Sequence, residues 1–225
     1  MPGIIINPRG ASGAGKTEFV RRIIADYKRE NGGRLEPVHR LGREQPIGYL
    51  VPHPHGGRPL AVLGHYGGVR GGCDTISLSD GGLEAVFRLA DFYASIGHDV
   101  LLEGLLLSRE RMRTATLAER HPLTILRLDT TLEQCIRNVI ARRRAGRAAW
   151  LRIAQTVAVA DQEIEDACAA LQGNAIVMAL SFDAAISYIH GLLGVQGKAI
   201  APLPSIIAAG RHDGAAPWQG QAGPS

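Results

Sequence analysis

Short apolar runs alternate with longer amphipathic segments along most of this 225-residue chain. The first run is Ile-Ile-Ile at residues 4–6, and similar runs recur at 100–104, 123–129 and 175–180. Short continuous apolar runs are typical of strands that are buried on both faces of a parallel sheet. Apolar residues at helical spacing follow these runs. They predict helices from Thr17 to about Asn31, over 82–95, from Thr130 through an Arg-rich segment, over 148–172 and over 182–193.

This alternation of strands and helices predicts an α/β fold with three layers, in which helices cover both faces of a mainly parallel sheet. Residues 1–193 form the predicted domain. Within it, residues 36–80 are rich in Gly, Pro and His, and apolar runs at 47–51 and 59–63 predict a hairpin in an insertion on the substrate side. Residues 194–225, rich in Gly, Ala and Pro, are expected to form a loosely attached tail.

Residues 10–17 read Gly-Ala-Ser-Gly-Ala-Gly-Lys-Thr, a complete phosphate-binding loop between a strand and a helix. Glycine allows the backbone to curl so that successive N–H groups point at a triphosphate. We expect Lys16 to reach the β- and γ-phosphates of ATP and the Thr17 hydroxyl to bind Mg²⁺. The nucleotide-binding residues predicted from this loop are Gly10, Ser12, Gly13, Ala14, Gly15, Lys16 and Thr17.

Acidic residues follow the other predicted strands, and the carboxyl ends of parallel strands share one edge of the sheet. Glu103 ends the run Val-Leu-Leu-Glu and is the predicted second ligand of Mg²⁺ or of its waters. Asp129 is the alternative for that role, and either carboxylate can also be a solvated strand end. Asp183 follows the last strand.

The segment 137–147 carries five arginines and one glycine, Gly146. Fixed cations stabilise the charge that spreads over a transferred phosphoryl group. Arg143 and Arg147 lie at helical spacing, so we expect a mobile lid that closes over bound nucleotide. A solvated basic helix face or a docking face for nucleic acid are the alternatives.

Residues 64–75 read Gly-His-Tyr-Gly-Gly-Val-Arg-Gly-Gly-Cys-Asp-Thr, a glycine-rich loop that also carries chemically active side chains. Asp74 is the candidate to accept the proton of an attacking hydroxyl. His65 and Tyr66 are candidates to stack on a planar substrate, and Arg70 to contact a phosphate. A flexible surface loop is the alternative.

Composition adds limits to this interpretation. The net charge is +4, but residues 109–152 contain eleven arginines against four acidic residues, a local charge of +7. Such a charge suits a polyanionic partner, and a GC-rich genome that favours Arg codons is the other explanation. The three cysteines lie far apart, no apolar run approaches a membrane span, and the first strand begins at once, so a cytoplasmic protein is expected.

The order of these features resembles the small P-loop kinases of nucleosides, nucleotides and related metabolites, over about residues 3–193. The resemblance rests on the phosphate loop, the Val-Leu-Leu-Glu-Gly strand, the stretch Asp-Thr-Thr-Leu-Glu-Gln-Cys-Ile-Arg from Asp129, and the Arg-rich lid. It implies a P-loop NTPase fold, ATP and Mg²⁺ as cofactors, Arg143 and Arg147 as lid arginines, and Asp183 in the loop near the adenine.

Within that family, the Gly-Gly-x-x-Gly-Gly-Cys-Asp-Thr loop is most similar to phage kinases that phosphorylate 5-hydroxymethyluracil in DNA. The resemblance implies a DNA acceptor, with a free nucleoside or metabolite as the alternative. No Asp-Arg-Tyr motif follows the substrate-side helix, so the base of ordinary nucleoside kinases has no counterpart here. A DNA-binding ATPase without an acceptor is less consistent, because neither Asn-Lys-x-Asp nor a strand ending in Asp-Glu is present. The oligomeric state is left open.

Overall fold

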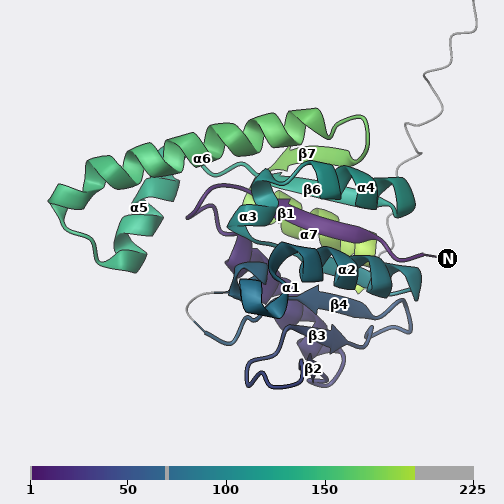
Figure 1. The fold of residues 1–225 in the computed structure, drawn as a ribbon. Helices are drawn as coiled ribbons and strands as arrows, with labels where there is room; N and C mark the ends of the chain where they lie inside the picture. The colour runs from purple at the N-terminus through teal and green to yellow at the C-terminus, as the bar shows by residue number, and fades with distance from the viewer. Residues whose placement is uncertain (1, 69–70, 196–225) are drawn as a thin grey trace, which may run out of the picture.

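A central sheet organises the structure, a computed structural model that describes residues 2–68 and 71–195 (Figure 1). In this part of the chain the sheet has seven strands in the order β2-β3-β4-β5-β1-β6-β7. The strands are β1 (Ile5–Arg9), β2 (Glu36–Val38), β3 (Gly48–Val51), β4 (Leu60–Leu63), β5 (Asp99–Leu102), β6 (Leu123–Leu128) and β7 (Ile176–Leu180).

The five strands from β4 to β7 across the sheet are parallel, and β2 and β3 continue it in antiparallel pairing. The α/β fold with a mainly parallel sheet is therefore confirmed. The hairpin predicted within 36–80 is β3 and β4, whose register pairs Val51 with Leu60. Because β4 also pairs with β5, the hairpin belongs to the central sheet and does not stand apart as an inserted unit.

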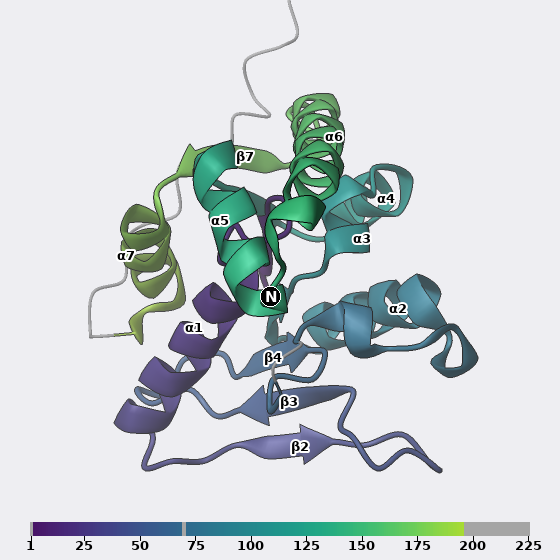
Figure 2. The same ribbon diagram turned by 90° about the vertical axis from the view of Figure 1, so that its left-hand side faces the viewer.

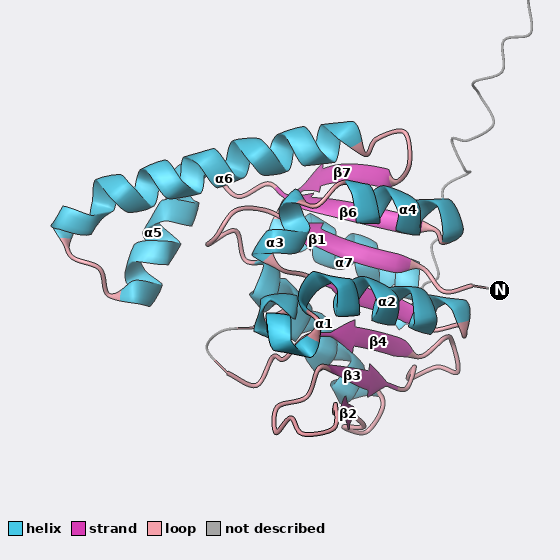
Figure 3. Ribbon diagram, in the orientation of Figure 1, coloured by secondary structure: helices cyan, strands magenta, loops and turns pink. Residues whose placement is uncertain are grey.

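Helices cover both faces of this sheet, as Figure 2 shows edge-on and Figure 3 shows by colour. Helices α1 and α7 contact each other on one face, while α2, α3 and α4 lie on the other. Helix α6 packs against α3 and α5. The helices are α1 (Lys16–Glu30), α2 (Gly82–Ser95), α3 (Leu105–Arg109), α4 (Met112–Arg120), α5 (Leu132–Arg143), α6 (Trp150–Ala170) and α7 (Phe182–Leu193). None of the helices in the described ranges is long and apolar enough to cross a membrane.

The apolar residues of α1 at helical spacing form its buried face. Phe19, Ile23 and Tyr27 are fully buried against the sheet and α7, and Phe19 meets Phe182 edge to face. The helix ends at Asn31, followed by Gly32 and Gly33 at positive φ, as the sequence predicts. This packing fixes the first turn of α1 at the carboxyl end of β1.

Two helix boundaries differ from the sequence prediction for local reasons. Thr131, and not Thr130, caps α5, because its hydroxyl accepts a hydrogen bond from the N–H of Gln134. Arg144 then ends α5 in the left-handed conformation, and Arg147 begins the 3₁₀ turn η3 (Arg147–Ala149). Arg143 and Arg147 therefore do not share one helix, which corrects the expected helical spacing between them.

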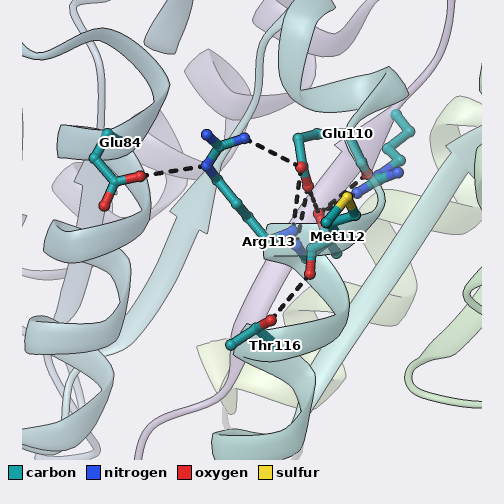
Figure 4. A network of polar contacts seen from close by, with 7 residues as sticks. Glu84, Glu110, Met112, Arg113 and Thr116 are labelled. Carbon is teal, nitrogen blue, oxygen red and sulfur yellow. Dashed lines mark hydrogen bonds and ion pairs between the residues drawn. The ribbon is translucent and has the colours of Figure 1, made fainter.

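Helices α3 and α4 were not expected from the sequence, and a carboxylate organises the junction between them (Figure 4). Glu110 accepts hydrogen bonds from the backbone N–H groups of Arg113 and Thr114, in the first turn of α4. Arg113 also reaches Glu84 on α2 at 3.3 Å. Glu110 therefore supplies the cap that α4 otherwise lacks.

The buried side chain of Arg9 connects this junction to β1. Its guanidinium donates to Asn7 Oδ1, to the carbonyl of Ser108 on α3 and to Thr114 Oγ1 on α4. Burial lowers the pKa of Arg9 to about 10. Since Arg9 directly precedes Gly10, these bonds fix α3 and α4 relative to the start of the phosphate loop.

We predict that Glu110→Ala destabilises the fold by about 1–2 kcal/mol, the usual cost of losing a helix N-terminal cap. Chemical denaturation measures this change. Glu119→Ala is the matched control, because Glu119 is an exposed carboxylate near the end of the same helix. Equal stability of the two variants would show that Glu110 does not cap α4.

Candidate active site

The loop between β1 and α1 has the backbone conformation that its glycines permit. Gly10, Gly13 and Gly15 have φ values of 156°, 91° and 95°. A Cβ atom on Gly13 would lie 2.3 Å from the carbonyl oxygen of Cys135, so no other residue fits there without movement. The loop leads directly into the amino end of α1, where backbone N–H groups without helical partners favour an anion.

Lys16 is buried within this loop, and its ammonium group donates to the loop's own carbonyls. The Nζ atom lies 2.6 Å from the oxygen of Gly10 and 3.1 Å from that of Ala11. Burial lowers the pKa of Lys16, and the nearby Glu103 carboxylate opposes that shift. The ammonium therefore lies where a phosphate bound by the loop would meet it.

The start of α5 holds the opposite side of the loop. Asn138 donates from its side-chain amide to the carbonyl of Gly13 at 2.8 Å, and Thr130 donates to that of Ala14 at 3.0 Å. These bonds couple α5 directly to the phosphate loop. The sequence analysis did not select Asn138 or Thr130.

Glu103 and Thr17, which were predicted as partners at the metal, lie in contact. The Thr17 hydroxyl donates to Glu103 Oε1 at 2.9 Å, across 86 positions of the sequence. Glu103 is only 2% exposed, and Gly72 passes so close that a Cβ there would lie 2.3 Å from Glu103 Oε1. Asp129, the alternative, is exposed at the end of β6. The structure thus brings Glu103 to the loop.

A hydroxyl and a carboxylate are the oxygen ligands that Mg²⁺ takes together with substrate phosphates. Within 2–68 and 71–195, no group of three or more His, Cys, Asp or Glu side chains is arranged to hold a metal ion. A magnesium ion here would therefore depend on the phosphates of the nucleotide. Burial raises the pKa of Glu103 to about 7, while Lys16 and the hydrogen bond from Thr17 lower it. A cation at this point would favour the ionised carboxylate further.

Asp74 lies beside this pair, in the 3₁₀ turn η1 (Cys73–Thr75). Its carboxylate accepts a hydrogen bond from the N–H of Leu105 at 2.6 Å and a longer one from Leu106. Asp74 is exposed, and its charge acts on both Lys16 and Glu103. Asp74 therefore anchors the start of α3, and its carboxylate stays exposed to solvent beside Glu103.

The glycine-rich loop is closed by a bridge between His65 and Gly72. His65 stacks on Tyr49 and its Nδ1 lies 2.9 Å from the Tyr49 hydroxyl. Arg21 of α1 donates to the carbonyls of Tyr66 and Gly68, which holds the loop against α1. Arg70, the predicted phosphate contact, lies outside the described residues.

Tyr66 is buried, 7% exposed, and its hydroxyl donates to the carbonyl of Leu63. Its ring lines a cavity of about 540 Å³ between α1 and β3, which Tyr49, Arg21 and Lys28 also line. Stacking by Tyr66 stays a prediction.

The lid arginines differ in their position relative to the loop. Arg142 follows Asn138 by one helical turn on α5, and its charge contributes to lowering the pKa of Lys16. Arg143 is exposed on the same helix. Sequence reasoning selected Arg143 and Arg147 and missed Arg142, which the spacing from Asn138 indicates once Asn138 is known to touch the loop.

Asp183 is exposed in the first turn of α7, beside the loop. Its neighbour Phe182 would lie 3.5 Å from a Cβ placed on Gly15. Phe182 therefore borders the nucleotide side of the loop, and sequence reasoning did not select it. An aromatic residue two positions after a strand end was its only signal.

A comparison with curated proteins identifies the family. The chain is 43% identical over 140 residues to the 5-hmdU DNA kinase of Pseudomonas phage PaMx11, and the match covers 62% of this chain and 69% of the phage protein. No protein-family model matches. The chain belongs to the 5-hmdU DNA kinase family.

This kinase is therefore a phosphotransferase, and the predicted resemblance to phage kinases is confirmed. A kinase must bind a nucleotide and balance the negative charge of its phosphates. A phosphate loop beside a buried carboxylate is consistent with that requirement.

We predict that Glu103→Gln raises the stability of the kinase at pH 8 without metal or nucleotide. The carboxyl has a pKa of about 7 in the fold against 4.5 in the unfolded chain, so the folded state binds more protons between these values. The stability that the neutral, buried carboxyl contributes is fully present below pH 4.5 and is lost as the pH rises through 7 and the group ionises.

Removing the charge should therefore add on the order of 3 kcal/mol at pH 8, and the gain should shrink toward pH 5. Urea unfolding at both pH values measures this. Parallel pH curves for the variant and the wild type would contradict a buried carboxyl that titrates near 7.

Proposed function

We propose that this chain transfers the γ-phosphoryl group of ATP to the hydroxymethyl oxygen of 5-hydroxymethyluracil in phage DNA. The oxygen–phosphorus bond to the acceptor forms, the bond between the γ-phosphorus and the bridging oxygen breaks, and ADP leaves. The observation that carries this proposal is the 43% identity over 140 residues to a phage 5-hmdU DNA kinase. The contact of Thr17 with Glu103 beside the loop supports it.

The loop of residues 10–17 would hold the triphosphate of ATP, as in P-loop NTPases. Lys16 already points its ammonium at the centre of the loop, where it bonds to the carbonyls of Gly10 and Ala11. A bound phosphate offers a negatively charged acceptor in place of these neutral carbonyls, and such charge-assisted bonds are stronger. Asp183 and Phe182, at the start of α7, would border the adenine.

Magnesium would bind between the nucleotide and the Thr17–Glu103 pair. The Thr17 hydroxyl would be a direct ligand, and Glu103 would hold the ion or its waters. Bound Mg²⁺ neutralises charge on the phosphates. Glu103 stays ionised in its presence, although burial alone favours the neutral form.

Asp74 is the candidate to orient the acceptor hydroxyl and accept its proton. It is exposed beside Glu103, and two backbone N–H groups of α3 hold its carboxylate in place. A carboxylate fixed in this way keeps lone pairs for a substrate hydroxyl. The lid would supply cations to the transferred group, from Arg142 together with the predicted Arg143 and Arg147.

The first test compares labelled γ-phosphate transfer to three samples: an oligonucleotide that contains 5-hydroxymethyluracil, the free nucleoside, and a blank without acceptor. We expect label on the oligonucleotide, and none with Lys16→Ala, because that variant loses the cation that meets the phosphates. Label on the free nucleoside alone would show that the acceptor is a nucleoside and not DNA. Release of phosphate in the blank alone would indicate an ATPase.

Asp74→Asn should lower the rate of transfer by about 10²-fold or more while ATP affinity is unchanged, because general-base catalysis contributes factors of this size. Asparagine keeps an oxygen that can accept the N–H of Leu105, so the anchoring bond of α3 is preserved. Single-turnover kinetics and nucleotide titration separate the two effects. A rate within a few-fold of the wild type would exclude Asp74 as the base.

Arg142→Ala should lower the rate of the chemical step by on the order of 10²-fold, with a smaller effect on ATP affinity, since lid cations act mainly on the transition state. Arg143→Ala is the neighbouring comparison, because Arg143 is equally exposed on α5 but is not among the charges that act on Lys16. Equal losses in both variants would mean that proximity to Lys16 does not decide which arginine acts.

A further inference from the structure

Helices α5 and α6 form an arm that projects past the carboxyl ends of the strands (Figure 1). The two helices pack on each other and are joined by residues 144–149, which lie at the tip of the arm. Ile153 and Val157 of α6 are buried, so the arm has its own apolar interior.

An aromatic residue is left in solvent at this tip. Trp150, the first residue of α6, is 51% exposed, and the adjacent Leu151 is 62% exposed. Neither is needed to fill the interior of the arm, which Ile153 and Val157 occupy. Large apolar side chains gathered on a projecting element indicate an interaction site.

The charge of the arm identifies the chemistry of the partner. From Gln134 to Ala160 the sequence contains six arginines and no acidic residue. Arg142, Arg143, Arg144 and Arg152 are all exposed. Exposed guanidinium groups around the tip complement a phosphate backbone. Since the chain belongs to a family of DNA kinases, that backbone is DNA.

The arm also places its tip close to the phosphate loop. Asn138 on α5 bonds to the loop at Gly13, and α5 ends five residues later at Arg143. At a rise of about 1.5 Å per residue, the helix extends roughly 8 Å beyond the loop. That length corresponds to about two or three nucleotides of a DNA strand. A strand whose target base occupied the site would thus have its neighbouring nucleotides within the length of this helix end.

We propose that Trp150 inserts into duplex DNA next to the target base, with Leu151 beside it and with Arg144 and Arg152 on the flanking phosphates. This inference rests on the proposed function. A base that enters an enzyme site must leave the stack, which costs a few kcal/mol. An apolar side chain that occupies the gap offsets part of that cost, as wedge residues do in other DNA-binding proteins.

The decisive experiment compares Trp150→Ala with the wild type on three acceptors that contain the same modified base: a duplex, a single strand and the free nucleoside. We expect transfer to the duplex to fall about tenfold or more, because the stacking of one base on an aromatic side chain is worth a factor of this size. Transfer to the single strand and to the nucleoside should change by less than about threefold, since neither has a stack to open.

Phe92→Ala is the matched control, because Phe92 is an aromatic residue of similar exposure, 54%, on the distant helix α2. It should leave all three rates unchanged. If Trp150→Ala loses the same fraction of its transfer rate with all three acceptors, or loses none, the wedge proposal is wrong. Thermal unfolding should be the same for both variants and the wild type, since both side chains are exposed.

A second readout does not depend on phosphoryl transfer. A duplex with 2-aminopurine at the target position should brighten on binding the wild type and Trp150→Phe, but not Trp150→Ala, because the wedge holds the target position out of the stack. Brightening by Trp150→Ala equal to the wild type would overturn the proposal. If the wild type transfers phosphate to no acceptor, the proposed function fails, and this signal alone then decides whether the wedge exists.

The proposed phosphate contacts of Arg144 and Arg152 can be tested separately, through the salt dependence of DNA affinity. Each phosphate contact to duplex DNA contributes about 0.9 to the slope of log affinity against log salt. The double variant Arg144→Gln/Arg152→Gln should therefore reduce the slope by about 1.8. An unchanged slope would show that these two arginines do not contact DNA phosphates.

Discussion

The site depends on one constraint, the burial of a positive charge inside a backbone loop. The Lys16 ammonium lies out of solvent and is held by the carbonyls of Gly10 and Ala11, at the amino end of α1. The backbone can close around it only because glycines occupy the positions of positive φ. The neighbouring elements are arranged around this loop. Helix α5 bonds to its outer carbonyls, and Glu103 supplies a counter-charge from the adjacent strand.

Three segments far apart in the sequence meet at this loop because of the strand order. Strand β1 lies between β5 and β6, so the residues that follow all three strands share one edge of the sheet. Glu103 follows β5, and Cys73 and Asp74 reach it through the bond from the Cys73 N–H to the Glu103 carbonyl. Helix α5 follows β6. The residues proposed for nucleotide, metal and acceptor thus lie at one edge of the sheet, and the arm of α5 and α6 extends beyond that edge.

The sequence predicted the parts of this arrangement that depend on local chemistry. The buried strands follow from apolar runs, and they lie where the sequence predicts them. Thr17 and Glu103 follow from the loop pattern and from a strand end, and their side chains are in contact, while their roles at phosphate and metal stay predictions. Helices α3 and α4 were missed, because their cap is Glu110 and their anchors are Arg9 and Asp74, which are contacts from other elements.

The predicted lid, residues 137–147, also depends on contacts that the sequence does not reveal. Spacing in the sequence favoured Arg143 and Arg147 on one helix, whereas α5 ends at Arg143 through the left-handed Arg144. Arg142 lies nearer the loop because α5 is oriented by Asn138, whose bond to Gly13 joins residues 125 positions apart. Side-chain bonds across such a separation leave no periodic signal in a single sequence. The exposed Trp150 was likewise not selected, since its exposure follows from the packing of the two arm helices.

The most direct test of this account is a crystal structure with Mg²⁺ and a non-hydrolysable ATP analogue. The account predicts that Lys16 exchanges the carbonyls of Gly10 and Ala11 for the β- and γ-phosphates. It also predicts that the metal binds Thr17 Oγ1, with Glu103 on the ion or on one of its waters. A metal held by Asp129, or phosphates bound away from the loop with Lys16 still on its carbonyls, would contradict it.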